Sequence, residues 1–394
     1  MKSENDMDAD IALKRFIDLT QIPGRSGEER DVADRIVEML VTAGLDESQI
    51  QFDDAHSRTH LKGNCGNLIV TLPGNRSGVR TMLSAHMDTV PICVGSQPVV
   101  DQGQVRSSVK TGLGADDRSG CAAILTAAIE RIRLGDENFP PAVIAFFIQE
   151  EIGLHGARCL DVAKVGQIDR AFNFDGGSPD KIRTGAVGGE RINIKLTGTP
   201  AHAGVAPEQG ASAIVMAAKA IADLDGRGWL GKVVKDEGVG TANVGIINGG
   251  DATNVITPEV TLRAEGRSHD AAMRTRIVQE IRDAFTKAAE SVMTDSGVKG
   301  TIDFDSNVDY ESFRLSDDHP SVEAASVAIK RIDRTPTCEV ANGGLDANWL
   351  FQHGIEAVTL GCGQKNIHTV DERLEIGDFL DACRIASWLI TAGA

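Results

Sequence analysis

Short apolar runs alternate with segments of helical periodicity in the first half of the chain. Four runs have the length of buried strands, at residues 67–72, 80–85, 142–149 and 171–174. Residues 8–20 and 120–133 have the pattern of helices. Strands that alternate with helices indicate a largely parallel sheet that is covered on both faces. We therefore expect an α/β domain in which a mostly parallel sheet is flanked by helices.

A further helix is expected after Ser26. The segment Ser26-Gly-Glu-Glu29 has the spacing of a capping box, in which the Ser and Glu side chains accept backbone N–H groups at the start of a helix. We expect this helix to begin at that segment and to continue to about residue 45.

The pattern changes near Gly188. The elements expected there are strands and helices in the order βαββαβ, at residues 190–196, 207–224, 241–247, 260–267, 270–293 and 301–310. Alternation along these strands predicts a separate α+β module. The first pattern then resumes, with a helix at 322–332, a strand at 357–360 and a helix at 376–392. We expect a discontinuous domain of residues 1–187 and 311–394, into which residues 188–310 are inserted.

Length and composition exclude several classes of protein. A chain of 394 residues exceeds what one hydrophobic core usually organises, which agrees with two domains. The formal charge of −17 disfavours binding to nucleic acid or to an anionic membrane, and no apolar run approaches the roughly 18 to 20 residues of a membrane span. The acidic N-terminus lacks the features of a secretory signal, so we expect a cytoplasmic protein. Seven scattered cysteines are expected to be reduced thiols.

Acidic and histidine side chains follow the predicted strands of the first domain. His86 and Asp88 point to the same face of a strand, so one could bind a metal ion and the other could orient it. A buried, hydrogen-bonded polar pair is the alternative when these two residues are considered alone. Asp175 follows another strand, and His368 lies in a loop after Gly361-Cys-Gly363. Each of these could instead be an ordinary turn or surface residue.

Two pairs of adjacent acids strengthen the interpretation as a metal site. Asp116 and Asp117 lie in a glycine-rich turn before a helix, where a carboxylate could bridge two metal ions or simply cap the helix. Glu150 and Glu151 end a buried strand, where two like charges raise each other's pKa unless a cation or a proton intervenes. One could bind metal while the other transfers protons. The alternative is a solvated charge pair at a loop.

Seven segments in order along the chain resemble one known family, the co-catalytic zinc hydrolases that include peptidase T, carboxypeptidase G and aminoacylase. They are Ser84-Ala-His-Met-Asp-Thr89, Gly114-Ala-Asp-Asp-Arg-Ser-Gly120, Glu150-Glu-Ile-Gly153, Asp175-Gly-Gly177, Pro200-Ala-His-Ala-Gly204, Thr253-Asn-Val-Ile256 and Ile367-His368. The resemblance implies that His86 and Asp175 hold one metal ion, that Glu151 and His368 hold the other, and that Asp116 bridges both.

The resemblance also implies roles for other residues. Glu150 would be the general acid and base, and Asp88 would orient His86. A cis peptide would join Asp116 to Asp117. The inserted domain would be a lid that pairs two subunits, from which His202 would help stabilise an oxyanion in a neighbouring active site.

Four residues match positions that contact the substrate in relatives. Asn254 and Arg267 would hold a carboxylate or carbonyl of the substrate, and a strand-end salt bridge is the alternative for Arg267. Gly343 and Gly344 match a glycine-rich segment that lines the pocket. Asn342 and Leu345 depart from the usual sequence of that segment, and Arg118 replaces a common lysine.

The expected protein is a dizinc, peptidase T-like exopeptidase that cleaves short peptides, as a tripeptide aminopeptidase does, by attack of a metal-bridging hydroxide. The two divalent metal ions would be zinc, and manganese or cobalt could also occupy such ligands. The expected partners are a short peptide substrate and a second copy of the chain, paired through the lid. The alternatives are an N-acyl amino acid deacylase or a carboxypeptidase of the same family, and a non-catalytic binding homologue. The intact set of metal-binding residues argues against the last of these.

Overall fold

The computed structural model describes residues 7–135 and 139–391. Residue contacts divide the chain into two units, residues 1–186 with 314–394, and residues 187–313. The second unit begins one residue earlier and ends three residues later than the segment 188–310 defined by the sequence pattern. No helix in the described residues is long and apolar enough to cross a membrane.

The nine-stranded mixed sheet of the larger unit has the strand order β1-β2-β6-β3-β7-β16-β8-β14, where β14 is Phe313–Arg314, and β15 also pairs with β8. Its four central strands, β6, β3, β7 and β16, are parallel to their neighbours within that group. Their carboxyl ends therefore meet at one edge of the sheet, where α/β proteins usually bind ligands. The other strands are β1 (Ile50–Phe52), β2 (Leu68–Leu72), β3 (Thr81–His86), β6 (Ala142–Phe147), β7 (Arg170–Phe174), β8 (Lys181–Ala186), β15 (Thr337–Ala341) and β16 (Ala357–Leu360).

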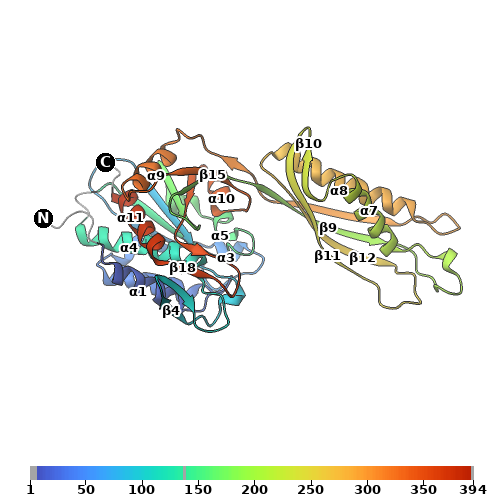
Figure 1. Ribbon diagram of the computed structural model, residues 1–394, viewed down its shortest axis with the longest axis horizontal. Coiled ribbons are helices and arrows are strands. Elements are labelled where there is room, and N and C mark those ends of the chain that lie inside the picture. The colour runs from blue at the N-terminus through green and yellow to red at the C-terminus, as the bar shows by residue number, and fades with distance from the viewer. Residues whose placement is uncertain (1–6, 136–138, 392–394) are drawn as a thin grey trace. The chain divides into compact units, whose positions relative to one another are not determined.

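Helices flank this sheet, as the predicted fold class requires. Helix α4 packs against β3 and against α1 and α11, and α9 packs against β7 and β8 (Figure 1). Alanine and other small residues are buried all around α4, which is typical of a helix enclosed by a core. The helices are α1 (Ala9–Thr20), α2 (Arg30–Thr42), α3 (Ala55–Arg58), α4 (Ala115–Leu134), α5 (His155–Arg158), α6 (Val162–Val165), α9 (Pro320–Lys330), α10 (Asp346–Gln352) and α11 (Ile376–Thr391).

A small antiparallel sheet lies in the same unit, with strand order β17-β18-β5-β4. It joins segments from before and after the insertion, because β18 pairs with β5. The strands are β4 (Pro98–Asp101), β5 (Gln104–Ser107), β17 (Gln364–Lys365) and β18 (Arg373–Glu375).

The predicted capping box at Ser26 does not form. Helix α2 begins at Arg30, and its N-cap residue Glu29 makes no side-chain cap. The Ser26 hydroxyl instead donates to Asp88 Oδ2 at 2.6 Å, and Glu29 Oε1 accepts the backbone N–H groups of Gly27 and Gln149. The Ser26 side chain therefore has a distant partner, and the Glu29 side chain has one local and one distant partner, so neither completes the predicted capping box.

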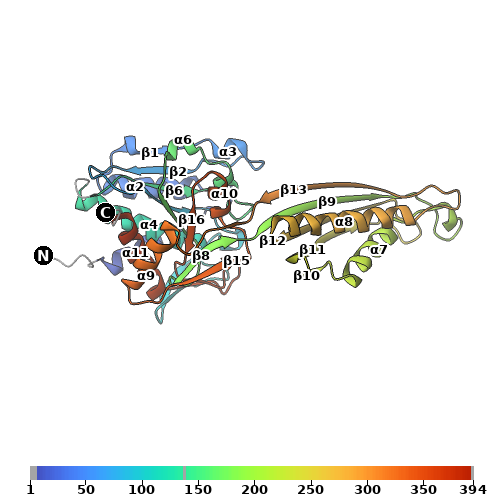
Figure 2. The same cartoon turned by 90° about the horizontal axis from the view of Figure 1, so that it is seen from above.

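The inserted unit is a five-stranded antiparallel sheet with strand order β10-β11-β12-β9-β13. Helices α7 and α8 pack against each other and against the sheet (Figure 2). Buried residues on alternate positions of β9 and β12, including Ile192, Ile194 and Leu262, form its core with those helices. The elements are β9 (Gly188–Thr197), α7 (Ala213–Gly226), β10 (Gly231–Lys235), β11 (Gly238–Gly249), β12 (Glu259–Ser268), α8 (Ala271–Ser291) and β13 (Thr301–Tyr310).

The predicted βαββαβ order is wrong by one strand, because β10 was not recognised. Only Val233 is fully buried among its five residues, so the hydrophobic pattern there is too short to identify a strand. Its pairing with β11 across the turn at residues 236–237 defines it instead.

Candidate metal centre

His86 lies at the carboxyl end of β3 and is buried together with Asp88. Its Nδ1 lies 3.1 Å from the Asp88 carbonyl oxygen and 3.4 Å from Asp88 Oδ1. Its Nε2 lies 3.3 Å from Asp116 Oδ1. One nitrogen is therefore fixed by Asp88, and the other faces the acidic turn.

The acidic turn, residues 112–117, precedes the regular part of α4. Gly114 has a φ of 81°, a left-handed conformation that glycine adopts readily, and the peptide between Asp116 and Asp117 is cis, as the resemblance implies. Asp117 Oδ1 accepts the N–H of Gly120, and its Oδ2 accepts the N–H of His86 at 3.2 Å. Asp117 therefore caps the helix and holds the end of β3.

Glu150 and Glu151 follow β6. Their backbone N–H groups donate to Asp88 Oδ1 and Oδ2 at 3.0 and 3.2 Å, so Asp88 connects the ends of two strands. Within the described residues, the Glu150 carboxylate has no hydrogen bond or ion pair, whereas Glu151 Oε2 lies 2.9 Å from His368 Nε2. Burial raises the pKa of Glu150 well above its usual value, against the opposing charge of His86.

Asp175 and His368 complete the group. Asp175 follows β7, and its Oδ1 accepts a hydrogen bond from the Gln364 amide at 3.1 Å. His368 has a φ of 63°, and its Nε2 lies 3.2 Å from Asp116 Oδ2. The two oxygens of Asp116 thus face different histidines, since Oδ1 faces His86.

These side chains form two overlapping clusters whose potential ligand atoms lie within 4.8 Å of one another. One contains His86, Asp116 and Glu151, and the other contains His86, Asp117 and Asp175. Burial raises the pKa of Glu151 to about 7. Hydrogen bonds to Asp116 and Glu151 raise the pKa of His368 to about 10. The carboxylates of Asp116 and Glu151 therefore favour a positive charge at His368.

The residues present fit a pair of divalent metal ions. Asp116 Oδ1 is buried and accepts no hydrogen bond among the described residues. The donors are imidazole nitrogens and carboxylate oxygens, which suit zinc and other divalent transition metals. A bound cation would displace the proton on His368 and offset the repulsion among the acids.

Residues 82–392 match Peptidase family M20/M25/M40. The chain is also 33% identical to the uncharacterized protein YqjE of Bacillus subtilis over 385 residues, which cover 97% of this chain and 98% of that protein. The chain belongs to the M20 family. This confirms the predicted family, and with it the interpretation as a metallopeptidase.

Two solved structures are similar to this M20 peptidase over almost its whole length. Aminopeptidase PepT of Bacillus cereus is 31% identical with a TM-score of 0.85, and a tripeptidase of Staphylococcus aureus is 30% identical with a TM-score of 0.88. Each comparison covers 98% of this chain and 99% of the other. The likeness confirms the peptidase T-like recognition and the fold class.

Three predicted residues of the M20 peptidase belong to the inserted unit. His202 and Asn254 lie on exposed loops that are joined by the bond from Ala203 N to Asn254 O at 2.9 Å. Arg267 lies on β12, where its Nε and Nη2 donate to Glu265. The strand salt bridge weighed for Arg267 is therefore present.

The predicted glycines lie before α10. Gly343 is exposed, Gly344 is partly exposed, and an added Cβ at Gly343 would meet no atom within 4 Å. Asp346 follows, fully buried, and neither of its carboxylate oxygens has a partner among the described residues. Burial raises the pKa of Asp346 well above its usual value, and the negative charge of Asp175 contributes.

Sequence reasoning missed several residues that support the centre. Gln364 and Glu372 reach Asp175 and the acidic turn across more than 180 residues of sequence, so no local spacing could identify them. Ser26 was singled out by its sequence pattern, but as a helix cap rather than as a hydrogen-bond donor to Asp88.

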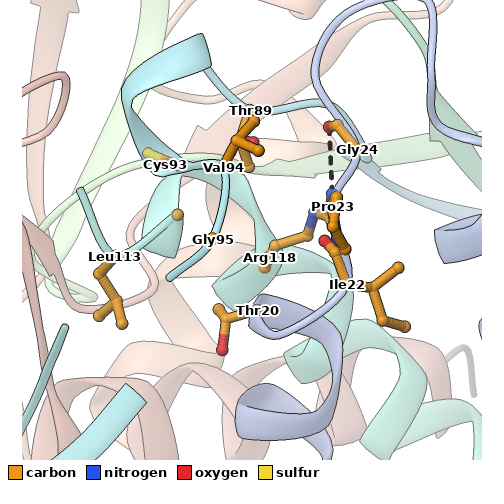
Figure 3. A pocket seen from close by; sticks show the side chains of 11 residues that line it. Thr20, Ile22, Pro23, Gly24, Thr89, Cys93, Val94, Gly95, Leu113 and Arg118 are labelled. Carbon is orange, nitrogen blue, oxygen red and sulfur yellow. Dashed lines mark hydrogen bonds between the residues drawn. The ribbon is translucent and has the colours of Figure 1, made fainter. Parts of the chain in front are cut away.

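Arg118 follows the acidic turn, and its side chain lies beside Ile22, Pro23 and Gly24 (Figure 3). It is fully buried, and its guanidinium donates to the carbonyl oxygens of Leu19 and Gly24 at 2.8 and 3.2 Å. The cavity beside it measures about 10 Å³, room for a single water molecule at most. Arg118 therefore fixes the loop after α1.

Proposed function

We propose that this M20 peptidase is a two-metal exopeptidase for short peptides. In the proposed set, His86 and Asp175 hold one ion, Glu151 and His368 hold the other, and Asp116 bridges them. The observation that carries this proposal is the orientation of Asp116, whose two oxygens lie 3.3 and 3.2 Å from the Nε2 atoms of His86 and His368. Zinc is the proposed ion because mixed imidazole and carboxylate ligands suit it.

Glu150 is the proposed general acid and base. The chemistry that two bound divalent ions supply is polarisation of the scissile carbonyl and activation of water at neutral pH. The Glu150 carboxylate is free of protein partners in the described chain, and it directly precedes the proposed ligand Glu151. It takes the proton of the attacking water and returns it to the leaving amine. Asp88 holds His86 and the backbone of both glutamates in place.

The proposed substrate is a tripeptide with a free N-terminus. This part rests on the likeness to the B. cereus aminopeptidase and the S. aureus tripeptidase. From the inserted unit, Arg267 and Asn254 would hold the peptide terminus, and His202 would stabilise the oxyanion. Gly343 and Gly344 would line the pocket. Pairing of two copies through the inserted unit and a cytoplasmic location stay predictions.

The test is hydrolysis of a matched panel by the zinc-loaded protein. The panel contains a free tripeptide, its N-acetylated form, its C-terminal amide and an N-acyl amino acid. We expect cleavage of the tripeptide and loss of cleavage on N-acetylation. Preference for the acylated compounds would replace the proposal with a deacylase or carboxypeptidase. Absence of turnover with two metal ions bound would favour a binding protein.

A further inference from the structure

Glu372 is a buried carboxylate outside the proposed ligand set. It lies four residues after His368 and is only 2% exposed. Its backbone N–H donates to the Thr369 carbonyl at 3.3 Å, so it belongs to the same turn as His368. Strand β18 begins at the next residue and pairs with β5. The position of Glu372 is therefore fixed from both sides.

Both oxygens of this carboxylate are used by the acidic turn. Oε2 accepts the N–H of Gly114 at 2.8 Å, and Oε1 accepts the N–H of Asp116 at 3.0 Å. The Cys93 thiol also donates to Oε2 at 3.3 Å. One side chain thus binds the backbone on both sides of Ala115.

The surroundings leave the carboxylate little room to move. A Cβ added at Gly112 would lie 3.0 Å from Glu372 Oε2 and 2.6 Å from Cys93 Sγ. Gly114, with its positive φ, bends the chain where the first of the two N–H groups points at Glu372. The turn is therefore held in one orientation relative to the loop that carries His368.

We propose that Glu372 is a positioning residue that locks the backbone of the bridging ligand Asp116 to the loop of His368, and thereby sets the affinity of the centre for metal. The inference rests on the proposed ligand set, and it does not depend on which peptide is cleaved. Groups that orient metal ligands commonly change metal affinity by about 10- to 100-fold when they are removed.

The carboxylate is the chemical group that this position requires. Two backbone N–H donors converge on it, and a carboxylate offers an acceptor to each. A glutamine has the same shape but only one acceptor, so its NH₂ group would face one of the two N–H groups. Glu372→Gln therefore breaks one contact and leaves the volume unchanged.

The experiment compares zinc binding by apo wild type, Glu372→Gln and Glu375→Gln. Zinc affinity is measured by competition with a chelating indicator, and the absorption spectrum of the Co²⁺-loaded protein reports ligand geometry. Glu375 is the matched control because it lies three residues further on, in β18, and bonds to Gln104 and Arg373 rather than to the acidic turn. Thermal unfolding of each apoprotein is recorded in parallel.

We expect Glu372→Gln to weaken zinc binding by about 10- to 100-fold and to change the Co²⁺ spectrum, while Glu375→Gln stays within twofold of wild type. A merely structural role would lower the apoprotein unfolding temperature and leave the zinc affinity of the folded protein unchanged. That result would overturn the proposal, as would an equal loss of affinity in both variants. Wild type that binds two zinc ions without cleaving peptides would overturn the proposed function and leave this inference intact.

Discussion

The two pairs of adjacent acids in the centre are used in different ways. In the pair Asp116 and Asp117, the first residue faces both histidines and the second binds backbone N–H groups of His86 and Gly120. In the pair Glu150 and Glu151, the second residue faces His368, and the carboxylate of the first has no partner in the described chain. Each pair supplies one proposed ligand, but the other member caps a helix in one case and remains free in the other.

The difference shows how the surroundings assign roles to neighbouring carboxylates. Asp117 lies at the start of a long helix, where free N–H groups require an acceptor. The backbone N–H groups of Glu150 and Glu151 are already bonded to Asp88. The Glu150 side chain therefore does not accept these N–H groups, as Asp117 accepts those of its surroundings. A carboxylate without a protein partner, beside the proposed metal ligands, is suited to moving protons.

Among the substitutions that test this comparison, Glu150→Gln is expected to have the largest effect. We expect turnover to fall by about 10²- to 10⁴-fold while both metal ions remain bound, because the amide cannot accept a proton. Steady-state kinetics and metal analysis of the same sample measure this. Glu151→Gln is the matched comparison, and it should lose metal. Full activity of Glu150→Gln with metal bound would remove Glu150 from the mechanism.

Asp117→Asn is expected to have a smaller effect. The amide keeps one acceptor, and its NH₂ group faces the N–H of either His86 or Gly120, which costs about 1–3 kcal/mol of unfolding free energy. We expect kcat/KM to fall about 10-fold, because the end of β3, which carries His86, would be displaced. Denaturant unfolding and kinetics separate the two effects. A loss of turnover as large as that of Glu150→Gln would show that Asp117 acts in the chemistry.

The smallest effect is expected for Ser26→Ala. This change removes the 2.6 Å hydrogen bond to Asp88 Oδ2 but leaves both backbone donors to that carboxylate. We expect a loss of about 0.5–1.5 kcal/mol in unfolding free energy, with zinc affinity close to that of wild type. Calorimetry and zinc titration test this. A large loss of zinc affinity would mean that Asp88 depends on Ser26 for its orientation.

Buried runs of strand length allowed the central sheet and its acidic edge to be predicted. Strands β2, β3, β6 and β7 are almost entirely buried, and acidic side chains come shortly after β3, β6 and β7. The family resemblance then grouped His86, Asp116, Glu151, Asp175 and His368, which no spacing could have grouped. The structure brings these residues together at the carboxyl edge of the sheet.

The errors have a common physical cause. At Ser26 and Glu29, distant acceptors and donors outcompete the local capping pattern. Strand β10 is defined by its partner β11 rather than by its own pattern. Glu372 and Gln364 act through bonds to residues that are far away in the chain. Contacts of this kind form only in the folded protein, so they cannot be predicted from the sequence around each residue.

The discontinuity of the larger unit has a consequence for synthesis. His86, Asp116, Glu151 and Asp175 precede the inserted unit, whereas His368 and Glu372 follow it. At about 5–20 residues per second, a ribosome needs on the order of tens of seconds to reach His368 after Asp175 has been made. During that interval the nascent chain carries these acids without His368 and Glu372. The proposed centre can therefore be complete only after residue 372 has been made, and a chain released before that point lacks it.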